Sequence, residues 1–369
     1  MRGVSAQDGG PGSGGRTGRR SAREAVLLVG GEGTRLRPLT LTTPKPMLPV
    51  AGTPITIHQI TRARDAGVQR IVLGTAYRAD VFTDHLGDGS RLGVEIVYAH
   101  EETPLGTGGA IRNAAAHLRS DGDEPVLILN GDVLSGVDMA ALVDGHVATD
   151  AAVTLHLTRV DDPRRYGLVP TDGEGSVRQF LEKPQTPEEI VTDQINAGCY
   201  VFRRDVIDAI APDRVVSVER EVFPALLDSG ALVRGVVDTS YWLDLGTPWD
   251  FLQGSTDLVR GVAPWDGHQP ADFLVLDGAQ IASDAVIDNG STIGPGSRIA
   301  SGALVRGSVL FADAIIEQGA QVVDSVVGIG ACVGAGASVR GAVLGDGVVV
   351  RPGAQVAEGE RIDPGAVIS

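Results

Sequence analysis

Between residues 25 and 202 the chain alternates short apolar runs with longer stretches in which apolar residues recur every three or four positions. Short apolar runs are typical of buried strands, and the longer spacing is typical of amphipathic helices. Strands that alternate with helices predict an α/β domain with a mixed, mostly parallel sheet and helices on both faces. The predicted strands are 25–30, 70–75, 94–99, 125–130, 152–160 and 197–202, and the helices between them include 55–67 and 108–118.

From residue 281 onward the pattern changes to one aliphatic residue every six positions. Three steps are shorter by one residue, at 305–310, 322–327 and 339–344, and each recurs seventeen residues after the previous one. A three-sided coil explains this spacing, because one aliphatic residue per side points inward and small residues form the corners. The pattern predicts a left-handed parallel β-helix of hexapeptide repeats. The series is Ile281, Ile287, Ile293, Ile299, Val305, Leu310, Ile316, Val322, Val327, Val333, Val339, Leu344, Val350, Val356, Ile362 and Ile368.

Composition divides the chain into four parts. Residues 1–24 are rich in Gly, Ser and Arg without an apolar run, which predicts a flexible tail and argues against a secretory signal. We expect the α/β domain over 25–258, a linker containing Pro, Gly and Asp over 259–275, and the β-helix over 276–369.

The balance of charge limits the kinds of partner. The chain has 31 Lys and Arg against 47 Asp and Glu, a net charge of −16, which argues against binding to nucleic acid or to anionic membranes. No apolar run approaches the ~18 residues of a membrane span. Its two cysteines, Cys199 and Cys332, lie far apart and predict neither a disulfide framework nor a metal cluster. We therefore expect a cytoplasmic protein, and the repetitive coil favours a homo-oligomer formed through the β-helix.

A glycine-rich turn, GGEGTR at 30–35, follows the first predicted strand. Glycines let backbone N–H groups approach an anion closely, and the planar guanidinium of Arg35 suits phosphate oxygens. Lys45 adds a compact charge between two prolines, which restrict the backbone. The turn matches neither GxxxxGK[ST] nor GxGxxG. Together these residues predict a triphosphate site beyond the carboxyl ends of the strands.

Two aspartates end apolar stretches. Asp132 follows PVLILNG and Asp244 follows YWL. A carboxylate in such surroundings costs desolvation free energy unless it has a partner, and Mg²⁺ held by one or two carboxylates plus substrate phosphates would supply one. From the residues alone, each aspartate is equally compatible with a capped turn. The sequence Glu182-Lys183-Pro184 is by itself compatible with an ordinary turn.

The stretch from Gly31 to Pro49 resembles the signature of sugar-1-phosphate nucleotidyltransferases, GxGTRLxPLTxxxPKPMLP. The resemblance covers nearly the whole chain, and parts of it are most similar to the mannose-1-phosphate guanylyltransferases. The matching segments are ETPLGTGGA (102–110), LNGDVL (129–134), FLEKP (180–184), NAGCYVF (196–202), VEREVFP (218–224) and YWLDLGTPWDF (241–251).

The resemblance implies a Rossmann-like nucleotidyltransferase domain that uses Mg²⁺ to make GDP-mannose and pyrophosphate from GTP and mannose 1-phosphate. It implies catalytic roles for Arg35, Lys45 and Asp132, and metal binding by Asp132 and Asp244. The implied nucleotide-binding residues are Gly30, Gly31, Gly33, Thr34, Arg35, Lys45, Gly106, Thr107 and Asp132. The implied sugar-phosphate-binding residues are Gly167, Glu182, Lys183 and Asn196.

Three alternatives stay open. The same fold could act on glucose 1-phosphate with dTTP or UTP, or on a heptose or cyclitol phosphate with GTP. A non-catalytic regulatory paralogue is the second, although such paralogues typically lose phosphate-loop or metal residues that this chain keeps. The third is a bifunctional enzyme whose β-helix acetylates the sugar, which is disfavoured because no histidine follows His268.

Overall fold

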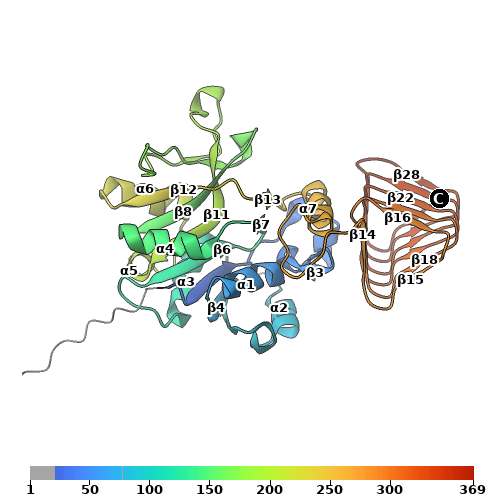
Figure 1. The fold of residues 1–369 in the computed structure, drawn as a ribbon, viewed down its shortest axis with the longest axis horizontal. Helices are drawn as coiled ribbons and strands as arrows, with labels where there is room; N and C mark the ends of the chain where they lie inside the picture. The colour runs from blue at the N-terminus through green and yellow to red at the C-terminus, as the bar shows by residue number, and fades with distance from the viewer. Residues whose placement is uncertain (1–20, 77) are drawn as a thin grey trace, which may run out of the picture.

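The computed structural model describes residues 21–76 and 78–369. An α/β domain is followed by a stack of short parallel strands wound into a three-sided coil, and the two parts lie side by side (Figure 1). Residues 1–20 of the predicted tail lie outside the described residues. No helix of the described ranges is long and apolar enough to cross a membrane.

The α/β domain is built around a nine-stranded sheet of order β10-β9-β11-β6-β1-β4-β5, with β8 and β12 joined to it through β11. The run β6-β1-β4-β5 is parallel, whereas β11 pairs antiparallel with β6 and β8. The mixed sheet predicted from the sequence is confirmed. Its strands are β1 (Glu24–Leu28), β4 (Arg70–Thr75), β5 (Glu95–His100), β6 (Pro125–Asn130), β8 (Val153–Arg159), β9 (Gly167–Leu168), β10 (Leu181–Glu182), β11 (Gln194–Arg203) and β12 (Val233–Val237).

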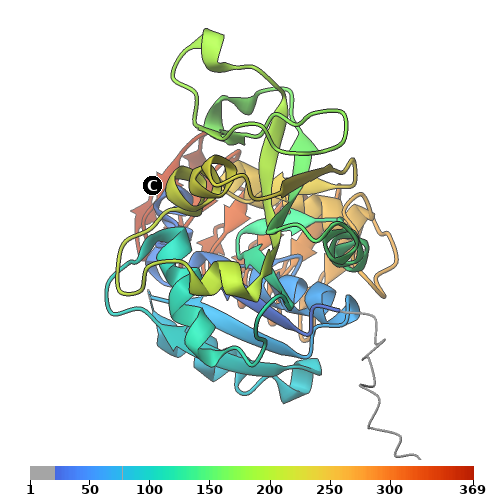
Figure 2. The ribbon, with the colours of Figure 1, turned by 90° about the vertical axis from the view of Figure 1, so that its left-hand side faces the viewer.

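Helices cover both faces of the sheet (Figure 2) because alternate strand residues point to opposite sides. Val26 of β1 packs in the cluster that holds Ile111 and Phe223, and Leu27 packs in the cluster that holds Ile60 and Phe82. The central strands are therefore apolar along most of their length, as expected for strands buried on both faces. The helices are α1 (Ile55–Asp65), α2 (Ala79–Leu86), α3 (Gly106–Ala114), α4 (Met139–Thr149), α5 (Arg204–Asp208), α6 (Phe223–Asp228) and α7 (Pro248–Arg260).

Short elements gather where β1 and β6 end. Strand β7 pairs antiparallel with β13, and β2 pairs with β3. The glycine-rich turn and the residues after it form three single 3₁₀ turns. These elements are β2 (Pro49–Val50), β3 (Thr53–Pro54), β7 (Val133–Ser135), β13 (Trp242–Asp244), η1 (Thr34–Leu36), η2 (Leu39–Leu41) and η3 (Lys45–Met47).

The C-terminal part has three parallel sheets, and strands of each sheet pair with the strand one coil later. The aliphatic series points inward as predicted: every member from Ile293 to Val356 is at most 2% exposed. This is the arrangement expected of the predicted β-helix. The first sheet has β14 (Phe273–Val275), β17 (Ser291–Ile293), β20 (Val309–Leu310), β23 (Val326–Val327), β26 (Val343–Leu344) and β29 (Arg361–Ile362). The second has β15 (Gln280–Ile281), β18 (Arg298–Ile299), β21 (Ile315–Ile316), β24 (Cys332–Val333), β27 (Val349–Val350) and β30 (Val367–Ile368). The third has β16 (Val286–Asp288), β19 (Leu304–Arg306), β22 (Gln321–Val323), β25 (Ser338–Arg340) and β28 (Gln355–Val356).

The first sheet of the β-helix, β14-β17-β20-β23-β26-β29, faces the α/β domain, and we call it the interface sheet. Its residues Val309, Val326 and Val343 share one buried cluster with Leu36 and Leu48 of the α/β domain. The ring centroids of Phe251 and Phe311 lie 6.0 Å apart across the same boundary. The two parts are therefore joined by a common apolar core.

Within the predicted linker over 259–275, α7 runs on to Arg260 and the first strand of the β-helix begins at Phe273. A capping box formed by Thr247 and Asp250 starts α7, and Gly261 in the left-handed conformation ends it.

Candidate active site

Two carboxylates from distant parts of the chain lie next to each other. Asp132 follows β6, and Asp244 ends β13, which pairs with β7 in a register that sets Asp244 opposite Val133. The backbone N–H of Leu245 donates to the Asp132 carbonyl oxygen at 3.0 Å. Strand pairing therefore holds both aspartates at one point beyond the carboxyl end of β6.

Lys45 lies between these carboxylates. Its Nζ donates to Asp132 Oδ2 at 2.6 Å and lies 3.8 Å from Asp244 Oδ1. The Lys45 side chain is 8% exposed, whereas those of Asp132 and Asp244 are 38% and 22% exposed. A compact ammonium group thus neutralises part of the charge of two carboxylates.

The glycine-rich turn packs directly on Lys45. Gly33 has a φ of 64°, and a Cβ on it would lie 2.7 Å from Lys45 Cβ. A side chain at position 33 would therefore clash with the lysine and also strain the backbone. The Thr40 hydroxyl donates to the Gly33 carbonyl oxygen at 2.9 Å and closes the loop over Lys45.

Burial raises the pKa of the Asp244 carboxyl above its ordinary value, and the neighbouring charge of Asp132 raises it further. The charges of Lys45 and Arg35 act in the opposite direction. Among the described residues no group of three or more His, Cys, Asp or Glu side chains could hold a metal ion. Two carboxylates are nevertheless the donor set expected for Mg²⁺, which takes its other ligands from water and phosphate oxygens. The residues present fit that ion.

Arg35 lies in η1 on the glycine-rich turn, and its guanidinium lies close enough to Asp244 for its charge to lower the pKa of that carboxyl. A Cβ on Gly246 would lie 3.0 Å from Asp244 Oδ2 and 3.1 Å from an Arg35 guanidinium nitrogen. The carboxylate and the guanidinium therefore pack against the same glycine. Arg35 is exposed, so its charge faces the adjoining pocket.

A pocket of about 470 Å³ opens beside Asp244 and Arg35. Six of its lining residues were predicted from the sequence as nucleotide-binding, metal-binding or sugar-phosphate-binding residues. The lining residues are Arg35, Arg165, Tyr166, Gly167, Glu182, Lys183, Asn196, Glu219, Asp244 and Asp250.

The sugar-phosphate side of the pocket contains Glu182 and Lys183. Glu182 of β10 pairs with Gly167 of β9, and the Lys183 Nζ lies 3.6 Å from Glu182 Oε1. Lys183 has a φ of 53° and a side chain that is 59% exposed. A left-handed conformation is unusual for a residue other than glycine, and here it leaves the ammonium group accessible. The chain has only two lysines, Lys45 and Lys183, and both lie at this site.

Asn196 is held in one orientation by two hydrogen bonds. Its Nδ2 donates to the Tyr200 hydroxyl at 2.8 Å, and its Oδ1 accepts from the Gly198 N–H at 3.1 Å. The Trp242 indole N–H donates to the Ala197 carbonyl oxygen at 2.9 Å, and its ring meets Tyr166 edge to face. This wall of the pocket is preorganised.

The predicted loop at Gly106 and Thr107 begins α3 and packs against residues 214–219. The Thr107 hydroxyl donates to Glu219 Oε2 at 3.0 Å and accepts from the Val218 N–H at 2.9 Å. Because Glu219 lines the pocket, the loop is connected to it through this carboxylate. Val218 begins η8 (Val218–Val222), a single π-helical turn.

Glu101 was missed by the sequence analysis. Its Oε2 accepts from the Leu105 N–H at 2.9 Å, and its Oε1 lies 3.7 Å from the Cβ position of Gly30. Glu101 thereby holds the start of the loop before α3 and lies close to Gly30 of the glycine-rich turn, and burial raises the pKa of its carboxyl. An acidic residue directly before ETPLG was the only available signal. Gly31 and Thr34 are exposed on the turn, outside the pocket lining.

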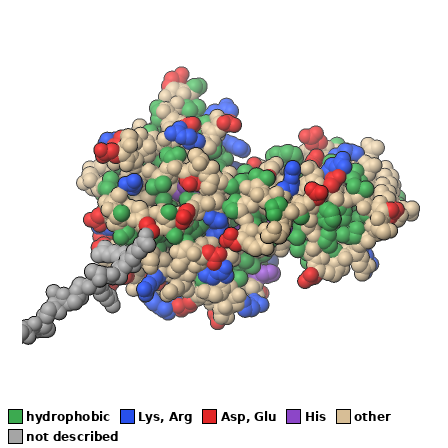
Figure 3. Space-filling view, viewed as in Figure 1, with side chains coloured by type: hydrophobic (Ala, Val, Ile, Leu, Met, Phe, Trp, Pro, Cys, Tyr) green, Lys and Arg blue, Asp and Glu red, His purple; other side chains and the backbone are tan. Residues whose placement is uncertain are grey.

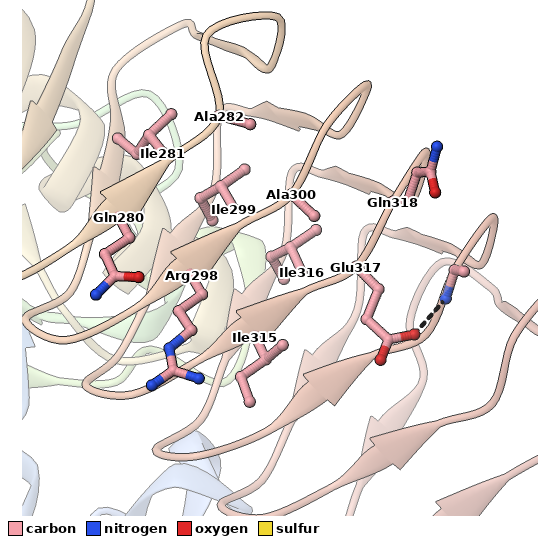
Figure 4. A pocket seen from close by; sticks show the side chains of 11 residues that line it. Gln280, Ile281, Ala282, Arg298, Ile299, Ala300, Ile315, Ile316, Glu317 and Gln318 are labelled. Carbon is pink, nitrogen blue, oxygen red and sulfur yellow. Dashed lines mark hydrogen bonds between the residues drawn. The ribbon is translucent and has the colours of Figure 1, made fainter.

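A larger, shallower hollow of about 550 Å³ lies on the β-helix (Figure 4). It is lined by residues of β15, β18 and β21 and of the turns after them, with Arg298 and Glu317 as the charged members of its lining. Glu317 already accepts from the Ala335 N–H at 2.8 Å. Unlike the pocket beside Asp244, this hollow assembles no cluster of charged groups.

Comparisons with known proteins show which family the chain resembles. The family model described as nucleotidyl transferase matches residues 24–261, and the GMPPB C-terminal domain matches residues 270–368. A Mycobacterium tuberculosis protein named mannose-1-phosphate guanylyltransferase is 52% identical over 303 residues, which cover 81% of this chain and 82% of that protein. The catalytic subunit beta of mannose-1-phosphate guanylyltransferase from Drosophila pseudoobscura is 38% identical over 74% of this chain and 71% of its own.

Among solved structures, HddC from Yersinia pseudotuberculosis complexed with GMP-PN is 28% identical. The match has a TM-score of 0.55 and covers 64% of this chain and 99% of HddC.

Proposed function

The chain belongs to the nucleotidyl transferase family, and we propose that it is a mannose-1-phosphate guanylyltransferase that makes GDP-mannose and pyrophosphate. One structural observation supports this most strongly. Arg35, the Lys45–Asp132–Asp244 cluster and the Lys183 ammonium group come from separate segments and meet around one pocket. The identity of 52% with the mycobacterial guanylyltransferase supports the choice of GTP and mannose 1-phosphate over the other substrate pairs.

In the proposed reaction a phosphate oxygen of mannose 1-phosphate attacks the α-phosphorus of GTP in line. A new phosphorus–oxygen bond forms, the bond from the α-phosphorus to the bridging oxygen breaks, and pyrophosphate leaves with that electron pair. The nucleophile is already an anion, so no general base is needed. Two anions must approach each other, and the protein must lower the Coulombic cost of that approach. Catalysis therefore depends on positioning and charge neutralisation.

We assign a role to each charged group. Arg35 and Lys45 bind the triphosphate and the leaving pyrophosphate. Lys183 binds the phosphate of the sugar. Glu182 accepts hydrogen bonds from the sugar hydroxyls, and the Asn196 amide can donate to them or accept from them. Asp132 and Asp244 would hold Mg²⁺, which supplies positive charge to phosphate oxygens near the α-phosphorus.

The base is expected at the loop that starts α3. Gly106 and Thr107 lie there. Glu101 accepts from the Leu105 N–H just before them, and Glu219 of the pocket accepts from the Thr107 hydroxyl. Backbone N–H and carbonyl groups of such a rigid loop can select a base by hydrogen bonding.

Two further predictions stay untested. We expect a homo-oligomer formed through the β-helix, on which apolar side chains are visible at the surface (Figure 3). The exposed apolar residues of the β-helix include Val286, Val349 and Val367. Cytoplasmic localisation is likewise a prediction from composition.

Pyrophosphate release tests the proposed function. The purified chain is incubated with Mg²⁺, mannose 1-phosphate and each of GTP, dTTP, UTP, ATP and CTP, with glucose 1-phosphate as the matched control sugar. We expect release with GTP and mannose 1-phosphate, and none when a chelator removes Mg²⁺. Release with dTTP or UTP would overturn the substrate assignment and keep the reaction class. If the folded protein releases no pyrophosphate with any of the five nucleotides, the proposal is contradicted, and a regulatory paralogue or an enzyme for another sugar phosphate is favoured.

A further inference from the structure

The interface sheet of the β-helix turns one row of side chains toward the α/β domain. Strand pairing aligns this row from coil to coil, and from β17 onward the residue that follows each member belongs to the inward aliphatic series. All residues of the row are uncharged except the last one. The row is Leu274, Thr292, Val309, Val326, Val343 and Arg361.

Arg361 enters this row through a change in the repeat. Val309 pairs with Val326 and Val326 with Val343, each seventeen residues on, but Val343 pairs with Arg361, eighteen residues on. The short step that recurs in the earlier coils is absent between Val356 and Ile362. The extra residue keeps the aliphatic position inward and sets Arg361 outward, at the place where valines contact the α/β domain in the earlier coils.

The Arg361 guanidinium contacts the backbone of the glycine-rich turn. Its Nη1 donates to the Arg35 carbonyl oxygen at 2.8 Å and lies 3.5 Å from the Arg37 carbonyl oxygen. A charged guanidinium makes a stronger hydrogen bond to a carbonyl oxygen than a neutral donor does. The acceptor belongs to the same residue whose side chain packs with Asp244 against Gly246.

A second contact holds the same stretch of chain. The Thr42 hydroxyl donates to Asp346 Oδ2 at 2.7 Å, while Asp346 Oδ1 accepts from the Ile329 N–H at 2.8 Å. Arg78 donates to the Thr42 carbonyl oxygen from the other side. Residues 35–42 are thus fixed at two points by the last coils of the β-helix.

We propose that Arg361 is a positioning residue for nucleotidyl transfer: through the Arg35 carbonyl it sets the place of the Arg35 guanidinium beside Asp244. The β-helix then contributes to the reaction as well as to the fold. This inference rests on the proposed function, because it assigns Arg361 a part in binding the triphosphate.

The alternative is that Arg361 only fastens one part of the molecule to the other. The apolar cluster around Val309, Val326 and Val343 already does so over a larger buried surface. A purely structural arginine would change stability and affect both substrates alike. A positioning arginine acts on the nucleotide alone, and only while Arg35 is present.

The test compares Arg361→Ala with Arg361→Lys, which keeps a charged donor, and with the matched control Arg340→Ala. Arg340 is an exposed arginine of β25 that donates to Gln321 within the β-helix. We expect Arg361→Ala to lower kcat/KM for the nucleoside triphosphate about tenfold. The KM for the sugar phosphate should stay within about twofold, Arg361→Lys should recover part of the loss, and Arg340→Ala should match the wild type.

A double-mutant cycle decides whether Arg361 acts through Arg35. In an Arg35→Ala background, Arg361→Ala should change kcat/KM by less than about twofold. An equal loss in both backgrounds would overturn the proposal, as would wild-type kinetics of folded Arg361→Ala or an equal loss from Arg340→Ala. If the alanine variant does not fold, Arg361→Gln takes its place under the same criteria.

Failure of the proposed function would be visible in the wild-type protein, as absence of pyrophosphate release with GTP. In that case calorimetry first identifies a nucleoside triphosphate that binds to the wild-type protein. The affinity for that nucleotide is then compared, in place of kcat/KM, among the wild type, the Arg361 variants and Arg340→Ala. An unchanged affinity in Arg361→Ala would then overturn the positioning role by itself.

Discussion

The α/β domain and the β-helix are both built on parallel strands, yet they treat polar groups in opposite ways. At the strand ends of the α/β domain, Lys45 is largely buried between Asp132 and Asp244. The described interior of the β-helix is a column of Ile, Val, Leu and Ala side chains, and the polar side chains buried with them are uncharged serines such as Ser308 and Ser325. Irregular loops can gather charges from distant segments, whereas a coil of identical turns repeats one environment. Charged groups therefore gather where regular secondary structure gives way to irregular segments.

Arg361 likewise lies at a change in the regular repeat. The β-helix places a charged side chain against the α/β domain at its last coil, where eighteen residues separate the paired positions, as in the first coil, instead of the seventeen of the coils between.

Removing a carboxylate from the charged cluster should have the largest effect. We expect Asp132→Ala to lower kcat/KM by at least about 100-fold, because a group that neutralises charge in the transition state is worth roughly 3 kcal/mol. The midpoint of thermal unfolding should change little. Asp84→Ala, an exposed aspartate of α2, is the control. Wild-type turnover of the Asp132 variant would contradict the assignment of the site.

A substitution in the interior of the β-helix should lower stability and leave activity unchanged. Val322 is 0% exposed in its interior, so Val322→Ala should lower the free energy of unfolding by about 2 kcal/mol. Because Val322 is remote from the charged cluster, kcat/KM at 25 °C should stay within about twofold. Val349→Ala, whose side chain is 39% exposed, should cost less than about 0.5 kcal/mol. Denaturant unfolding and steady-state kinetics measure the two effects, and an equal cost for the two valines would contradict the interior packing.

Lowering the pH should destabilise the α/β domain more than the β-helix. His156 of β8 is 1% exposed, and neither ring nitrogen has a hydrogen-bond partner. Burial lowers its pKa from 6.5 to about 4. A lowered pKa gives stability that is present above the unfolded-state value and is lost as the pH falls toward the folded-state value. By pH 5 the loss should reach about 2 kcal/mol.

His156→Leu should remove this part of the acid sensitivity, and His85→Leu, at an exposed position, should not. The β-helix has no histidine, so amide hydrogen exchange should show its protection unchanged by either variant between pH 7 and 5. Equal acid sensitivity of wild type and His156→Leu would contradict the role of this buried ring.

The smallest effect is expected at the exposed edge of the pocket. Lys183→Ala should raise the KM for mannose 1-phosphate about tenfold with little change in kcat, because solvent screens an ammonium group that is 59% exposed. Lys183→Arg keeps the charge and should recover part of the loss. A change confined to the KM for GTP would contradict the placement of the sugar phosphate.

Much of this arrangement could be predicted before the structure. The inward residues of the β-helix follow from spacing, because one aliphatic residue per side is a local rule repeated from coil to coil. The six main strands follow from short apolar runs. The resemblance to nucleotidyltransferases pointed to residues of the pocket such as Arg35, Lys183 and Asp244, and their individual roles stay predictions.

Glu101 and Arg361 could not be predicted in the same way. Neither stands in a distinctive local pattern, since one is an acid at a strand end and the other an arginine in one of many short strands of the repeat. Their significance comes from contacts with Leu105 and Gly30 in the first case and with the Arg35 carbonyl in the second.

The sequence by itself determined the two architectures and the chemical types at the site, because period and motif are properties of neighbouring residues. Only the tertiary structure decided which of those residues meet. Sheet order and strand register bring Asp244 next to Asp132, and the register of the last coil brings Arg361 to Arg35. Such contacts join segments more than a hundred residues apart, and they depend on how the whole chain packs.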